Sequence, residues 1–225
     1  MKKIQKYRIM QENHPDSLDA AENLCMLYHS LVINNTGLLW GGIAPNHLLI
    51  QHDAHEAVKQ CRIILRQPLK IDDQLVYSEV MAEDAVTANN ISQAKLSVNK
   101  IEKKLRYRKH SVKRATDNAL FVIYEVLGRI AVKNRQWKSA NDYLLKAGKV
   151  SGDPYALEIG PNMRLAHELL QHGERQVVVS YIKECMDHHL IVGEKSIMLK
   201  WIKKIRKGII PAFGDPVNGG FGLWY

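Results

Sequence analysis

The chain of 225 residues has few of the residues that mark several common classes of protein. Its three cysteines, Cys25, Cys61 and Cys185, are far apart and odd in number, so we expect no disulfide framework and a reducing compartment. No stretch approaches the roughly 20 apolar residues that span a bilayer, and no apolar run follows the basic amino-terminal residues as in a signal peptide. We therefore expect a cytoplasmic protein without a transmembrane segment.

The glycine patterns of phosphate-binding loops, dinucleotide folds and nucleophile elbows are also absent from the sequence. Gly219-Gly220-Phe221-Gly222 is rich in glycine, but no helix follows it to complete a phosphate site. His52, His55 and Glu56 share one helix face, but their order matches neither zinc-hydrolase motif, so we interpret them as an exposed polar surface. These absences predict a protein that is not an enzyme and that needs no cofactor or metal ion.

Helix is the structure that the sequence indicates nearly throughout. Few glycines or prolines interrupt the chain between Gly42 and Gly128, and no segment alternates apolar and polar residues as a strand does. The helices that we expect before the repeating part of the chain cover 17–32, 45–65, 72–88 and 92–106. Their expected starts or caps are the pair Asp16-Ser17, the pair Asp72-Asp73, and Ser92. The fold class is therefore all-α.

A spacing of small and apolar residues occurs three times along the chain. Gly128 is followed at offsets typical of two antiparallel helices by Ala140, Leu144 and Ala147, with Leu127 and Trp137 filling the space around the contact. The same offsets select Ala82, Ala94, Val98 and Ile101, and again Ala166, Val178, Ile182 and Cys185. The first members of the three sets lie 46 and then 38 residues apart. We assign the extra residues of the longer step to a connection over 109–120.

These residues resemble tetratricopeptide repeats, a family of helical hairpins that stack into a short solenoid and bind other macromolecules. Tyr124 stands where the family usually has an aromatic residue early in the first helix. The resemblance implies a ligand face on the first helix of each hairpin. The residues that it places there are Glu79, Glu83, Glu125, Arg129, Lys133, His167 and Gln171. Because this face carries both signs of charge, we expect it to bind an extended peptide.

The part of the chain from about 126 to 211 resembles an uncharacterised bacterial family. The shared motif begins with Gly160-Pro161-Asn162-Met163 and continues through Leu165-Ala166, Leu169-Leu170 and Gly173-Glu174. We interpret Gly160-Pro161-Asn162 as a turn and helix cap. This resemblance implies a bacterial helical-repeat protein and carries no activity with it.

Two segments carry most of the positive charge. The segment 100–114 has eight Lys or Arg and one Glu, and the segment 195–207 has six basic residues and no acidic one. The second segment has an apolar stripe, and we expect it to be a basic helix that caps the last hairpin, with contact to a membrane or partner as the alternative. The stripe comprises Ile197, Met198, Trp201, Ile202 and Ile205.

We divide the chain into an amino-terminal helical region (1–70), helical hairpins (71–190) and a basic capping helix with an aromatic tail (191–225). The predicted function is that of an adaptor or regulatory module that binds a protein or peptide. The alternative is a nucleic-acid-binding protein that uses the first basic segment. The residues of that alternative are Lys103, Lys104, Arg106, Arg108, Lys109, Lys113 and Arg114. Two copies of the chain could also pair as a homodimer.

Overall fold

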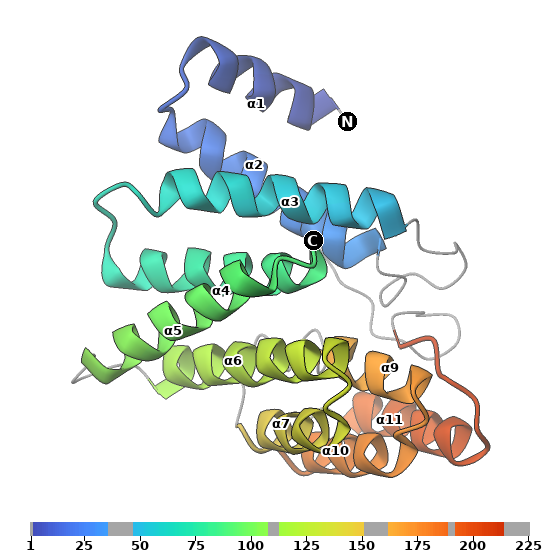
Figure 1. Ribbon diagram of the computed structural model, residues 1–225. Coiled ribbons are helices and arrows are strands. Elements are labelled where there is room, and N and C mark those ends of the chain that lie inside the picture. The colour runs from blue at the N-terminus through green and yellow to red at the C-terminus, as the bar shows by residue number, and fades with distance from the viewer. Residues whose placement is uncertain (1, 36–46, 108–112, 151–161, 189–191, 214–225) are drawn as a thin grey trace. The chain divides into compact units, whose positions relative to one another are not determined.

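The computed structural model describes residues 2–35, 47–107, 113–150, 162–188 and 192–213. Within these ranges the chain forms ten α-helices and no strand, which confirms the all-α class (Figure 1). The helices divide into two compact units, with the division near residue 108. The boundaries that we drew from the sequence, at residues 70 and 190, do not coincide with this division.

The first unit is a series of helices in which consecutive helices pack against one another (Figure 1). Its helices are α1 (Lys2–Asn13), α2 (Leu18–Asn35), α3 (His47–Ile64), α4 (Ile71–Thr87) and α5 (Ile91–Tyr107). The helix α1 was not predicted: its sequence is mostly polar, and none of its residues is fully buried in the structure. It packs on α2, where Ile4 and Tyr7 cover Leu24 and Tyr28.

The second unit pairs helices from separate hairpins as well as within them. Its helices are α6 (Lys113–Lys133), α7 (Trp137–Lys149), α9 (Arg164–Gln171), α10 (Arg175–His188) and α11 (Val192–Arg206). The helix α6 packs on both α7 and α9, and α10 packs on α7, α9 and α11. Residues 113–120 are helical, so our assignment of a connection up to residue 120 is wrong: the extra residues lengthen α6 instead.

The helix starts are partly as expected. Ser17 Oγ accepts a bond from the Ala20 N–H (3.3 Å) and so caps α2 as predicted. In α5 the cap is Asn90 rather than Ser92, because Asn90 Oδ1 accepts the Gln93 N–H (3.1 Å). Asp72 and Asp73 do not cap α4. They lie in its first turn, where their negative charge interacts favourably with the helix dipole.

Three of the turns between helices have the same backbone geometry. Their turn residues have positive φ: Asn89 (59°), Arg135 (57°) and Gly173 (86°). In each turn the following N–H donates to the carbonyl five residues before it, the pattern of a Schellman motif. These bonds run from Asn90 N to Ala85 O (2.8 Å), from Gln136 N to Ala131 O (2.9 Å) and from Glu174 N to Leu169 O (3.1 Å). The turn residues are 46 and 38 residues apart, the same steps that separate the three sets of small residues.

All twelve residues of these three sets are buried, as predicted. Each set spans two consecutive helices that pack together: α4 with α5, α6 with α7, and α9 with α10. The role of Gly128 differs from the expectation, which placed its close contact against α7. A Cβ atom at Gly128 would overlap the side chain of Leu165, so this glycine permits the approach of α9 to α6.

The helix α11 closes the core of the second unit. Met198, Trp201, Ile202 and Ile205 are buried against the preceding helices, and Ile197 packs beside them, so the predicted capping contact is present. Beyond the helix, the ring of Phe213 meets the indole of Trp201 edge to face, with centroids 5.0 Å apart.

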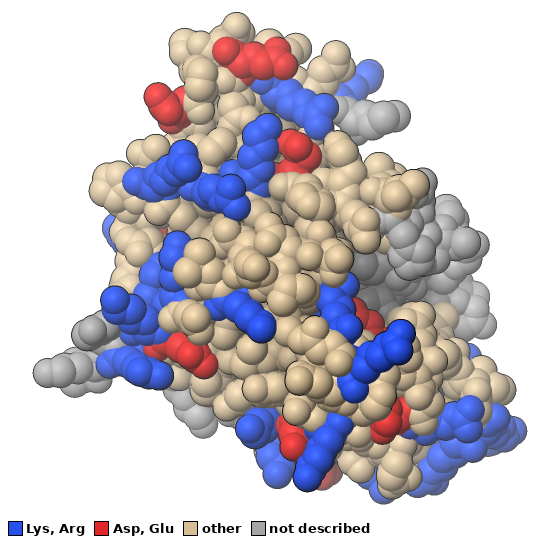
Figure 2. Space-filling model, in the orientation of Figure 1, with Lys and Arg blue, Asp and Glu red and all other residues tan. Residues whose placement is uncertain are grey.

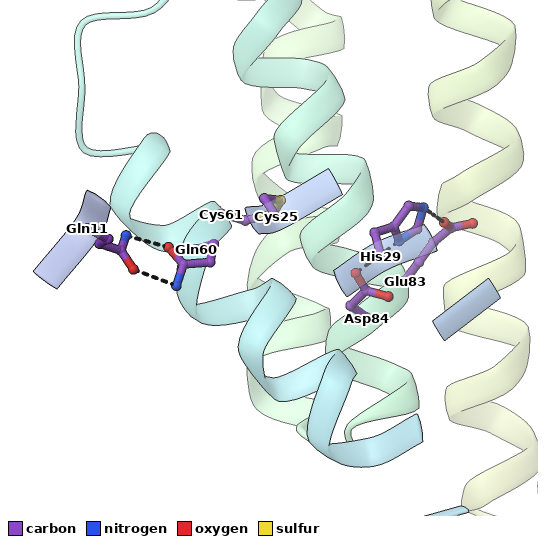
Figure 3. Close-up of a disulfide and its surroundings, with 7 residues drawn as sticks. All are labelled: Gln11, Cys25, His29, Gln60, Cys61, Glu83 and Asp84. Carbon is purple, nitrogen blue, oxygen red and sulfur yellow. Dashed lines mark hydrogen bonds and ion pairs between the residues drawn. A yellow bond between two sulfur atoms is a disulfide. The ribbon is translucent and has the colours of Figure 1, made fainter. Parts of the chain in front are cut away.

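The first unit contains a disulfide that the sequence did not predict. Cys25 of α2 and Cys61 of α3 are fully buried and bonded to each other, with Cα atoms 5.8 Å apart (Figure 3). Two helices that pack side by side bring these distant positions together, whereas spacing along the chain gave no sign of it. The expectation of no disulfide is therefore wrong, and our argument for a reducing compartment loses its basis.

Candidate partner-binding surface

The predicted ligand face of the first unit is only partly open. Glu79 is half-buried, and Glu83 is buried with Oε2 3.7 Å from Nε2 of His29. The neighbouring Asp84 is fully buried, and its Oδ2 lies 2.9 Å from Nδ1 of the same imidazole (Figure 3). Glu83 therefore faces α2 across the interior, in contrast to the open face that we predicted for it.

His29 was missed in the sequence. The signal that could have found it is the acidic pair Glu83-Asp84, which interrupts an otherwise apolar stretch of α4. Buried carboxylates need a cation or hydrogen-bond donors nearby, so such a pair predicts a polar partner on a facing helix. It does not by itself say which helix supplies that partner.

In the second unit, α6 and α9 bring three of the charged side chains together. Arg129 Nε donates to Glu168 Oε1 (2.8 Å), and Arg129 Nη1 lies 3.5 Å from Glu125 Oε1. Glu125 is 1% exposed and Arg129 5%, while the Glu168 side chain is about a quarter exposed. Glu125 and Arg129 thus lie in the interior instead of on the open face that we predicted, and their charges largely neutralise each other. Glu168 was not among the predicted residues.

The remaining predicted residues of this unit surround the buried network. Lys133 is exposed one turn beyond Arg129, and partial desolvation lowers its pKa, with the Glu168 carboxylate opposing that shift. Gln171 is exposed one turn beyond half-buried His167. Lys133 makes no ion pair, and the Gln171 side chain no hydrogen bond, with any residue that the structure describes. We call Lys133, His167, Glu168 and Gln171 the α6–α9 rim.

The carboxyl-terminal segment limits access to part of this rim. The ring of Phe213 contacts His167 edge to face, with centroids 6.4 Å apart. Burial lowers the pKa of His167, and the Glu168 carboxylate raises it by a smaller amount. Directly after α9, His172 packs against Trp137 with ring centroids 4.5 Å apart. The rim is therefore bounded by aromatic contacts on both sides.

The start of α9 confirms part of the turn and cap that we predicted, because Asn162 binds there, while Gly160 and Pro161 lie outside the described residues. Asn162 Oδ1 accepts the N–H of Arg164 (3.0 Å), and the Asn162 carbonyl accepts the hydroxyl of Tyr181 (2.9 Å). The first bond satisfies a donor at the helix start, and the second ties this start to α10. This arrangement fixes α9, and with it the rim, against the second helix of its hairpin.

The basic segment proposed for nucleic acid is described only in part. Lys103 and Arg106 are exposed on α5, whereas Lys104 turns inward and donates to Gln74 O (3.2 Å) and to Ser78 Oγ (3.4 Å). Burial of that ammonium lowers its pKa. Arg108 and Lys109 lie outside the described residues, as do the side chains of Lys113 and Arg114. That all seven residues form one phosphate-binding surface remains a prediction from the sequence.

The other candidates have ordinary structural roles. His52 and His55 are exposed on α3, as expected, whereas Glu56 is half-buried. Burial raises the pKa of the Cys185 thiol to about 12. Over the described ranges, no group of three or more His, Cys, Asp or Glu side chains is placed to bind a metal ion. None of the helices there has both the length and the apolar character of a membrane span.

Known proteins offer no further guide to these surfaces. No family model, no curated protein and no solved structure matches the chain. The resemblances to tetratricopeptide repeats and to a bacterial family therefore remain predictions from the sequence.

Proposed function

We propose that this protein is a binding module without catalytic activity, which recognises an extended segment of a partner protein through the α6–α9 rim. The observation that carries the proposal is that α6 and α9 hold side chains in ion pairs and, one turn further along, present polar side chains that are exposed. Arg129 is engaged by Glu125 and Glu168, while Lys133 and Gln171 are exposed beside them. A bacterial, cytoplasmic adaptor of the helical-repeat type is the class to which we assign it.

The chemistry of the rim favours a peptide as the ligand. The side-chain amide of Gln171 can donate to a backbone carbonyl and accept from a backbone N–H of an extended chain. The ammonium of Lys133 can pair with an acidic side chain of the same peptide. Because Arg129 is already held by two carboxylates, it adds rigidity to the surface rather than a second anion contact.

Site-specific photo-crosslinking in a bacterial lysate tests this proposal. A photoreactive amino acid placed at Gln171 should crosslink to a defined protein, and the product should survive nuclease treatment. The charge reversal Lys133→Glu should weaken the crosslink at least tenfold, because it replaces an attraction with a repulsion. The matched control is Lys183→Glu, the same charge change at an exposed position on α10.

Equal crosslinking in the Lys133→Glu and Lys183→Glu variants would reject the rim as the binding surface. Retention of nucleic acid alone, lost on adding salt, would instead favour the alternative function through the α5 cations, since phosphate contacts release counterions. A salt titration of the nucleic acid that the protein retains from the same lysate therefore separates the two functions.

A further inference from the structure

We propose that the outer face of α11 and the segment after it form a second binding surface, whose ligand is an anionic lipid bilayer. This surface does not include the α6–α9 rim, so the inference stands apart from the proposed function. Its residues are Leu199, Lys200, Lys203, Arg206, Lys207, Ile209 and Ile210, which we call the α11 surface.

The geometry of α11 separates two faces. Met198, Trp201, Ile202 and Ile205 occupy the buried face, so the residues between them in the helical period point outward. Leu199 is 55% exposed in the middle of the outer face, and Lys203 and Arg206 follow it at four and seven residues. Because these spacings lie along one side of a helix, the two cations follow the exposed leucine one and two turns further along the same face.

Two more large apolar side chains follow the last turn. Gly208 has a φ of 80°, and the N–H of Ile209 returns to the carbonyl of Lys204 (3.0 Å), so the chain turns away from the helix here. After the turn, Ile209 is 52% exposed and Ile210 41%, while Pro211 is buried. Figure 2 shows Lys and Arg side chains gathered where the end of α11 lies in Figure 1.

This combination favours a bilayer over other polyanions. A nucleic acid or an acidic peptide can pair with the cations but gains little from exposed aliphatic side chains. A bilayer with anionic headgroups pairs with the cations and also buries the aliphatic side chains. Lysines and arginines remain at the headgroups while leucine and isoleucine enter the acyl boundary. The segment 195–207 has six basic residues and no acidic one, which matches a uniformly negative surface.

Vesicle flotation with the full chain tests the inference. The probes are vesicles of phosphatidylcholine alone and of phosphatidylcholine mixed equally with phosphatidylglycerol. We expect binding only to the mixed vesicles. The triple variant Lys200→Gln, Lys203→Gln, Arg206→Gln should bind about a hundredfold more weakly, since each cation near such a surface contributes about fivefold. The matched control removes the same charge elsewhere, through Lys59→Gln, Lys138→Gln and Lys149→Gln, all exposed positions.

Leu199→Ser distinguishes a bilayer from a soluble polyanion. The variant should bind the mixed vesicles about tenfold more weakly while it retains its affinity for heparin, because only the bilayer contact uses the leucine. All the substituted side chains are exposed, and unchanged thermal unfolding will verify that the variants fold. No binding to the mixed vesicles, an equal loss in the control triple, or full binding by Leu199→Ser would each overturn the inference.

Discussion

The two units stabilise their buried polar and sulfur groups in different ways. The first unit places a disulfide between α2 and α3 and an imidazole against the carboxylate of Asp84. The second has a free buried thiol, Cys185, and an arginine between two carboxylates from two helices. Their turns, however, are built alike. The difference shows that the repeated feature is the backbone geometry of the hairpin, whereas each unit stabilises its interior with its own residues.

Removing the arginine of the second unit should have the largest effect. Arg129→Met leaves the buried Glu125 carboxylate without this cation, so we expect a loss of about 3–5 kcal/mol in the free energy of unfolding. Urea unfolding measures the loss, and hydrogen exchange should show it in α6 and α9 rather than in α2. The control is Lys133→Met, one turn further along α6 and exposed. Similar losses in both variants would mean that the buried network contributes little.

Breaking the disulfide should destabilise the first unit by about as much. The bond joins residues 36 positions apart, and closing a loop of this length reduces the entropy of the unfolded chain by the equivalent of about 3–4 kcal/mol. The double variant Cys25→Ala, Cys61→Ala should therefore lose protection from exchange in α2 and α3 first. Cys185→Ala, a change in the other unit, is the control.

Alkylation of the unfolded chain checks the same bond directly. Without reductant only Cys185 should react, and after reduction all three cysteines should. In the folded protein Cys185 should resist alkylation, because burial raises the pKa of its thiol to about 12. Three reactive thiols in the unreduced chain would contradict the pairing.

The shared turns predict opposite effects from matched substitutions. Gly173→Ala places a side chain at positive φ, where nothing lies within 4 Å of the new Cβ, so its cost of about 1 kcal/mol is conformational rather than steric. Arg135→Gly and Asn89→Gly place at the same positive φ a residue that adopts it without steric strain. Each should therefore raise the free energy of unfolding by a few tenths to about 1 kcal/mol. Thermal unfolding measures all three. A stabilising Gly173→Ala would refute the common geometry.

The sequence predicted the burial that a repeated spacing determines, but it did not predict contacts between residues that no repeated spacing connects. The burial of Ala82, Ala140 and Ala166 could be predicted because helical spacing within one hairpin determines it. The partner of Cys25 and the contact of Gly128 with Leu165 could not, because no repeated spacing along the chain connects these residues.

The candidate site shows the same limit. Charges four residues apart, as at Glu125 and Arg129, have the same pattern on a solvated face and on one that a second helix covers. The sequence therefore found the charged face of α6 but not its burial by α9, while Lys133 and Gln171 at its edge are exposed.

The smallest expected effect concerns pH, and it sharpens the contrast between two imidazole environments, that of buried His29 and that of half-buried His167. His29 lies beside two carboxylates, whereas burial lowers the pKa of His167 below its ordinary value of 6.5. The unfolded chain then binds a proton more readily than the folded one. The stability that neutral His167 contributes is complete above about pH 6.5 and is lost as the pH falls through the folded pKa. His167→Phe retains a ring beside Phe213 but cannot titrate, so its unfolding free energy should fall less than that of the unsubstituted protein between pH 7 and pH 5. Parallel pH dependences in the two proteins would show that His167 gains its proton equally well folded and unfolded.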